Sequence, residues 1–93
     1  MSNTHKQVAE GNDMVIRVDG KEFALSDDER RLILLTVAGY TNQDVARKFS
    51  LNASTVSRRT ARLLRKLSLA NKLELVLFAF HYGIISMISN TRR

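Results

Sequence analysis

The stretch that decides the fold runs from Asn52 to Leu67 and reads NASTVSRRTARLLRKL. Its apolar residues recur at the spacing of a helix that buries one face, which predicts a helix over residues 53–67. The residues expected on the buried face are Val56, Thr60, Leu63, Leu64 and Leu67. The opposite face carries Ser54, Arg58, Arg62 and Arg65, flanked by Arg59 and Lys66. No acidic residue interrupts the stretch, so the helix can pack on a core while it presents positive charge to a partner.

A shorter helix is predicted just before this stretch, over the segment TNQDVARKF that ends at Phe49. Thr41 and Asp44 form a weak version of the capping box that begins helices. Val45, Ala46 and Phe49 are expected to face inward, and only a short turn separates the two helices. Two helices joined in this way, the second one cationic, predict a helix-turn-helix whose second helix enters the major groove of DNA.

The segment that precedes these helices has the pattern of a β-hairpin. The runs MVIRV and KEFAL flank Asp19-Gly20, and Asp-Gly between two strand-like runs is a strong hairpin signal. The expected organisation is a disordered tail over residues 1–13, followed by a single DNA-binding domain over residues 14–93. The parts expected within this domain are a hairpin at 14–25, four helices over 26–85 and a tail at 86–93.

Capping residues mark the ends of the predicted helices. Ser26 and Glu29 form a capping box that begins the first helix, and Gly39 supplies a left-handed residue that ends it. The further signals are Asn52 before the third helix, and Asn71 with Glu74 before and Gly83 after the fourth.

The fourth predicted helix is apolar on almost every side. A helix without a polar face needs two partners, and one side can pack on the other helices. The other side is covered either by the hairpin and the tail or by a second subunit, and we expect the second subunit. The residues expected in this homodimer interface are Leu73, Val76, Leu77 and Phe80.

The net charge of +6 conceals a strong asymmetry along the chain. Residues 1–29 hold three basic and seven acidic residues, a net charge of −4. Residues 30–93 hold twelve basic and two acidic residues, a net charge of +10. A segregated positive surface favours a polyanionic partner, because each neutralised phosphate releases counterions. Double-stranded DNA is therefore the expected partner.

The composition also excludes several classes of protein. The absence of cysteine excludes a disulfide framework and a thiolate metal site. The longest apolar stretch, residues 73–88, is broken by polar residues and is too short to span a bilayer, and the polar N-terminus does not resemble a signal peptide. No histidine and carboxylate cluster has metal-binding spacing, and no serine lies beside a plausible base. We expect a cytoplasmic, nucleoid-associated protein that is not an enzyme and uses no cofactor or metal.

Several short motifs occur together between Leu25 and Ile85. They are Gly39-Tyr40-Thr41-Asn42, Asp44-Val45-Ala46, Thr55-Val56, Arg65-Lys66-Leu67 and Asn71-Lys72 before Glu74-Leu75. In this combination the chain resembles the C-terminal DNA-binding domain of LuxR, NarL/FixJ and GerE-type bacterial regulators. The resemblance implies a four-helix bundle in which the third helix enters the major groove, the second crosses the DNA backbone and the fourth pairs subunits.

The chain departs from the family pattern at two positions and in its organisation. Ser57 and Arg59 stand where the family usually has a lysine and a histidine, so the target sequence cannot be carried over. The family domain mostly follows a receiver or ligand-binding domain, whereas here a short hairpin precedes it. A stand-alone regulator of the GerE kind is the nearest precedent for the size.

The candidate site residues follow from the faces of the predicted helices. Arg58 and Arg62 are one turn apart, and each can donate to O6 and N7 of guanine. The residues expected to contact bases are Ser54, Ser57, Arg58, Ala61 and Arg62. The residues expected to contact phosphates, which position the helix without reading sequence, are Thr41, Arg47, Lys48, Thr55, Arg59, Arg65, Lys66 and Lys72.

The favoured interpretation is a dimeric, sequence-specific transcription regulator. The alternative is a helix-turn-helix adaptor that binds a regulator protein or an RNA polymerase subunit through the fourth helix and the hairpin, as sigma-factor region four meets polymerase. A winged-helix domain is a weaker alternative, because no second hairpin is predicted after the third helix.

Overall fold

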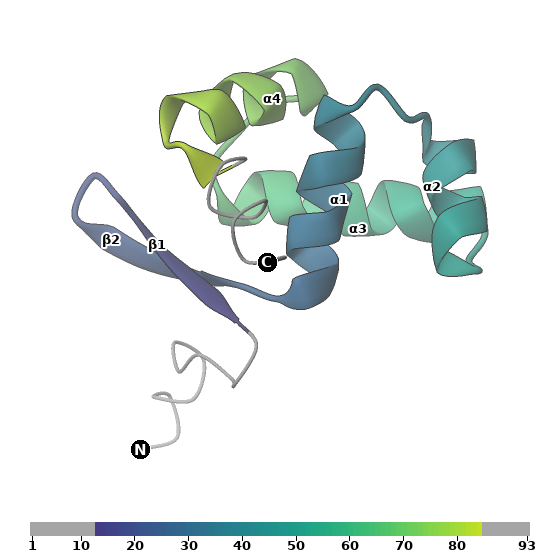
Figure 1. Ribbon diagram of the computed structural model, residues 1–93, viewed down its shortest axis with the longest axis horizontal. Coiled ribbons are helices and arrows are strands. Elements are labelled where there is room, and N and C mark those ends of the chain that lie inside the picture. The colour runs from purple at the N-terminus through teal and green to yellow at the C-terminus, as the bar shows by residue number, and fades with distance from the viewer. Residues whose placement is uncertain (1–12, 85–93) are drawn as a thin grey trace. The chain divides into compact units, whose positions relative to one another are not determined.

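The computed structural model describes residues 13–84 and confirms the predicted fold class. Two strands come first and helices follow (Figure 1). The elements are β1 (Met14–Val18), β2 (Lys21–Leu25), α1 (Asp27–Val37), α2 (Asn42–Phe49), α3 (Ala53–Lys66) and α4 (Lys72–His81). The chain divides into two compact units within α1, between Arg31 and Leu32.

The first unit contains the predicted hairpin. β1 and β2 pair antiparallel, with Met14 opposite Leu25 and Val18 opposite Lys21. The two turn residues, Asp19 and Gly20, have φ of 51° and 82°. Positive φ at both central residues is the geometry that makes Asp-Gly turns match the twist of a hairpin.

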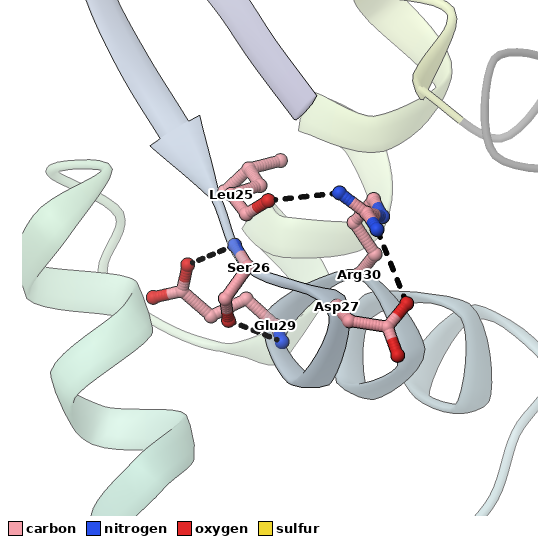
Figure 2. A network of polar contacts seen from close by, with 5 residues as sticks. All are labelled: Leu25, Ser26, Asp27, Glu29 and Arg30. Atoms are coloured by element: carbon pink, nitrogen blue, oxygen red, sulfur yellow. Dashed lines mark hydrogen bonds and ion pairs between the residues drawn. The ribbon is translucent and has the colours of Figure 1, made fainter. Parts of the chain in front are cut away.

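The step from β2 into α1 is held by the capping box that the sequence predicts (Figure 2). The Ser26 N–H donates to Glu29 Oε1 at 2.9 Å, and the Glu29 N–H donates to Ser26 Oγ at 3.1 Å. The Arg30 guanidinium donates to the Leu25 carbonyl oxygen at 3.0 Å and to Asp27 Oδ1 at 3.1 Å. These bonds satisfy backbone groups at the end of β2 and in the first turn of α1.

The second unit is built around the apolar faces of its helices. Most of its buried side chains come from the four helices, as the apolar spacing predicts, and Leu67 and Ile84 follow the ends of α3 and α4. The buried residues are Leu32, Ile33, Thr36, Val45, Ala46, Val56, Thr60, Leu63, Leu67, Leu75, Phe78, Ala79 and Ile84. Leu64 and Phe49, also expected to face inward, are half-buried. No helix within residues 13–84 is long and apolar enough to cross a membrane.

α1, α2 and α3 end with the same hydrogen-bond pattern, but different residues take the left-handed position after them. At the end of α1, Gly39 has φ of 92°. Its N–H donates to the Thr36 carbonyl at 3.0 Å, and the Tyr40 N–H donates to the Leu35 carbonyl at 3.1 Å. This pair of bonds is a Schellman motif, as the predicted stop at Gly39 requires. The same pair of bonds ends α2 and α3, where Ser50 and Ser68 take the left-handed position with φ of 59° and 60°.

The start of α4 differs in one detail from the prediction. Asn71 caps the helix, and its Oδ1 accepts from the Glu74 N–H at 2.9 Å. The Glu74 carboxylate accepts from the Ala70 N–H at 2.7 Å instead of closing the box on Asn71. The predicted disordered tail, except for Asp13, and the predicted C-terminal tail at 86–93 lie outside the described residues.

Candidate nucleic-acid interface

The helix-turn-helix consists of α2, α3 and the three residues that join them. α2 and α3 pack against each other and lie side by side in Figure 1. The left-handed Ser50 closes α2, with the Leu51 N–H donating to the Ala46 carbonyl at 2.8 Å, and Asn52 then caps α3. The chain therefore passes from α2 to α3 within a short turn, and the start of α3 is fixed relative to the end of α2.

The first turn of α3 is organised around one oxygen atom. Asn52 Oδ1 accepts from the Thr55 N–H at 3.0 Å, from Ser54 Oγ at 3.0 Å and from Thr55 Oγ1 at 2.9 Å. A backbone N–H can only donate, so this atom of the Asn52 amide is the oxygen and both hydroxyls are donors to it. The lone pairs of Ser54 Oγ are left for an outside partner. Thr55 Oγ1 also accepts from Arg58 Nη2, at 3.4 Å.

The cationic face of α3 is open to solvent. All five residues predicted to contact bases are exposed, as are Arg59 and Arg65, whereas Thr55, Lys66 and Lys72 are half-buried. Within residues 13–84 the side chains of Arg62 and Arg65 make no hydrogen bond or ion pair, so their guanidinium groups are available to a partner. α3 holds no acidic residue in its first turn, and its last turn is basic.

α2 adds cationic groups whose existing contacts are weak. Arg47 Nη2 lies 2.6 Å from Asp44 Oδ1, but the Arg47 side chain is 74% exposed. Solvent and salt screen an exposed pair of this kind, so a phosphate can replace the carboxylate at little cost. Lys48 Nζ lies 5.3 Å from the centre of the Tyr40 ring, a cation–π contact that holds the lysine near the surface.

Asp44 is the one acidic residue within this surface, and it serves the helix cap. Thr41 Oγ1 accepts from the Asp44 N–H at 3.1 Å, and Asp44 Oδ2 accepts from the Thr41 N–H at 3.3 Å, which completes the predicted box. Hydrogen bonding from the Thr41 side chain, then from its backbone, and the charge of Arg47 hold the pKa of Asp44 below its usual value. The carboxylate therefore remains ionised in the cap.

One contact across the helix-turn-helix was not anticipated from the sequence. Asn42 Nδ2, in the first turn of α2, donates to Ser57 Oγ on α3 at 3.0 Å. Ser57 was expected to contact bases, and the structure places it on the side of α3 that meets α2. The periodicity of the sequence carries no signal for this bond, because the two residues are fifteen positions apart.

Comparison with known proteins identifies the family. The model of the luxR family of bacterial regulatory proteins matches residues 24–79, more than half of the chain. The chain belongs to the luxR family. It is thus a member of a family of DNA-binding helix-turn-helix transcription regulators, and the resemblance inferred from the sequence motifs is confirmed.

Several curated relatives are response regulators named VraR. The protein from Staphylococcus saprophyticus is 29% identical over 85 residues, which cover 91% of this chain and 36% of that protein. The proteins from Staphylococcus aureus strain Mu3 and Staphylococcus epidermidis are 30% identical over 61 residues, 66% of this chain and 29% of theirs. The luxR-family chain thus spans about a third of the length of these relatives.

The luxR-family chain also carries an exposed apolar stripe on α4. Leu73, Leu77 and Phe80 are 66%, 59% and 62% exposed, and Val76 is half-buried. Residues spaced by three and four positions share one helix face, so these side chains form a continuous stripe. A shallow hollow of about 610 Å³ adjoins it, lined by Leu69, Glu74, Leu77, Phe78, Phe80, His81 and Tyr82. Residues 13–84 contain no cluster of histidine, aspartate and glutamate suited to a metal ion.

Proposed function

We propose that this luxR-family chain is a sequence-specific transcription regulator that places α3 in the major groove of DNA. The observation that supports this most is the exposed face of α3, on which Arg58 and Arg62 lie one turn apart with no carboxylate on the helix. An arginine that donates two hydrogen bonds to guanine contributes about 1–3 kcal/mol of discrimination against other bases. Small neighbours on the same face allow the helix to approach the base edges.

The proposed division of roles follows exposure and charge. The proposed base contacts are Arg58 and Arg62, with Ser54, Ser57 and Ala61 beside them. The Ser54 hydroxyl donates its hydrogen to Asn52, so its oxygen has only lone pairs to offer to DNA. It would accept from an amino group of adenine or cytosine. The proposed phosphate contacts are Thr41, Arg47, Lys48, Thr55, Arg59, Arg65, Lys66 and Lys72. The hydroxyl of Thr55 would have to turn away from Asn52 to donate to a phosphate.

The apolar stripe on α4 supports a homodimer, with Leu73, Val76, Leu77 and Phe80 in the interface. An exposed apolar surface of this kind marks an interaction site. A dimer would present two copies of α3 to two half-sites on the DNA. The second candidate function, an adaptor that binds a regulator protein or an RNA polymerase subunit, is favoured by the hollow beside the same stripe. We place the protein in the cytoplasm, associated with the nucleoid.

The proposal is tested by selecting a preferred duplex from random DNA with the wild-type protein. The dissociation constants for this duplex and for a scrambled duplex are then measured across a salt series, for wild type and for Arg58→Ala/Arg62→Ala. The ratio of the two constants is the preference of each protein for the selected sequence. We expect the variant to lose at least about 30-fold of the preference, because two base-reading side chains, each contributing about 1–3 kcal/mol, are gone.

The matched control is Arg17→Ala/Lys21→Ala, which removes the same charge from the hairpin. We expect it to keep the wild-type preference. Absence of DNA binding by the wild type, or an unchanged preference in Arg58→Ala/Arg62→Ala, would contradict the proposed function.

A further inference from the structure

The hydrogen bond between Asn42 and Ser57 connects the two helices of the helix-turn-helix at a particular place. Asn42 is the first residue of α2, and Ser57 precedes Arg58, one of the proposed base contacts. It joins a side chain of α2 to a side chain of α3, next to buried apolar groups such as Val45 and Val56. Apolar packing is not directional, whereas a hydrogen bond is, so this bond can specify an angle.

The donor end of this bond is itself fixed in position. Thr41 and Asp44 close a capping box around the start of α2, with bonds of 3.1 and 3.3 Å. Asn42 lies between them, in the first turn, so its backbone cannot drift with a fraying helix end. The Asn42 amide therefore starts from a defined point on α2 when it reaches Ser57.

The acceptor end lies where a small rotation of α3 has a large effect. Successive residues of a helix are about 100° apart around its axis, so the side of α3 that carries Ser57 determines where Arg58 points. Arg62 follows one turn later and turns with it. Two-point recognition of guanine requires both N–H groups of an arginine to align with O6 and N7, which makes it sensitive to that rotation.

We propose that Asn42 is a positioning residue, whose amide sets the rotation of α3 against α2 through Ser57 and so directs Arg58 and Arg62 at the bases. This inference rests on the proposed DNA-reading function and deepens it. It also changes the role of Ser57. The Ser57 oxygen accepts the Asn42 amide and anchors the helix, and base discrimination falls to the arginines.

A double-mutant cycle tests the bond. The variants are Asn42→Ala, Ser57→Ala and the two combined, each compared with wild type for the ratio of dissociation constants on scrambled and preferred duplexes. We expect either single change to lower the ratio by about 2- to 12-fold, the range that one net hydrogen bond covers. We expect the combined variant to be no worse than the singles, because all three lack the same bond.

Further variants separate positioning from other roles. Gln43→Ala changes an exposed neighbour on the same helix turn and should keep the wild-type ratio. Ser57→Thr keeps the hydroxyl and should retain most of it. Binding of Asn42→Ala to the scrambled duplex and its dependence on salt should match wild type, because no phosphate contact is lost. Circular dichroism and thermal unfolding verify that each variant is folded at the assay temperature.

Three results would overturn the inference. The first is a ratio of dissociation constants for Asn42→Ala that equals the ratio for wild type. The second is an equal weakening of Asn42→Ala on both duplexes, which would make Asn42 a phosphate contact. The third is an additive effect in the combined variant, which would give Ser57 a DNA contact of its own. A wild type without any preference contradicts the proposed function itself, whereas these results leave it standing.

Discussion

At the scale of single residues, two buried threonines show how similar side chains can differ in energy. Thr36 on α1 donates to the Leu32 carbonyl at 2.8 Å, which satisfies its hydroxyl within the helix. Thr60 on α3 is 5% exposed, and its Oγ1 has no hydrogen-bond partner within residues 13–84. A buried hydroxyl without a partner keeps the cost of leaving water and gains nothing in return.

Thr60→Val should therefore stabilise the protein. Valine has nearly the shape of threonine, and a buried unpaired hydroxyl costs about 1–3 kcal/mol, so we expect the free energy of unfolding to rise by about 1 kcal/mol in urea titrations. Thr36→Val is the matched control, because it removes a hydroxyl that is bonded, and we expect no gain from it. A Thr60→Val protein less stable than Thr36→Val would contradict this account of the α3 core face.

The residues of the candidate site were predictable to different degrees. Exposure of Arg58 and Arg62 follows from helical spacing alone, since their positions lie opposite Val56, Leu63 and Leu67. The Asn42–Ser57 bond and the three donors around Asn52 were not predictable in this way. They depend on side-chain torsions and on the crossing of two helices, and neither leaves a periodic signal in the sequence.

At the scale of elements, local signals were sufficient where the chemistry is local. Asp19-Gly20 and the Ser26–Glu29 box each act within four residues, and the structure confirms the hairpin and the start of α1. The ends of α2 and α3 carried no such signal. Glycine is the residue that marks a left-handed helix end, and here serines at 50 and 68 occupy that position.

The apolar stripe on α4 carries the prediction of a homodimer. Leu77→Asp should weaken self-association by at least about 10-fold, because burying one leucine contributes about 1.5–3 kcal/mol. Sedimentation over a range of concentrations measures this. The control is Gln43→Asp, which places the same charge at an exposed position of α2 and should associate as wild type does. Circular dichroism verifies that both variants are folded. A wild type that stays monomeric at the highest concentration would contradict the dimer.

At the scale of the whole molecule, the positive charge is concentrated in residues 30–93, which favours the binding of a polyanion by this part of the chain. Residues 30–93 carry twelve basic and two acidic residues, and Asp44 and Glu74, the two acids, both serve helix starts. The exposed side chains of Arg58, Arg62 and Arg65 on α3 face solvent or a partner. The family match covers α1 to α4 almost completely and includes the whole helix-turn-helix.

The most direct test of the central claim maps the DNA-binding face on the protein. The measurement is the change in backbone amide chemical shifts of ¹⁵N-labelled protein on titration with the duplex that the wild type selects. We predict the largest changes over residues 53–62 of α3 and smaller ones over residues 41–48. Changes concentrated on α4 or on the hairpin, with α3 unaffected, would contradict the claim that the exposed face of α3 reads DNA.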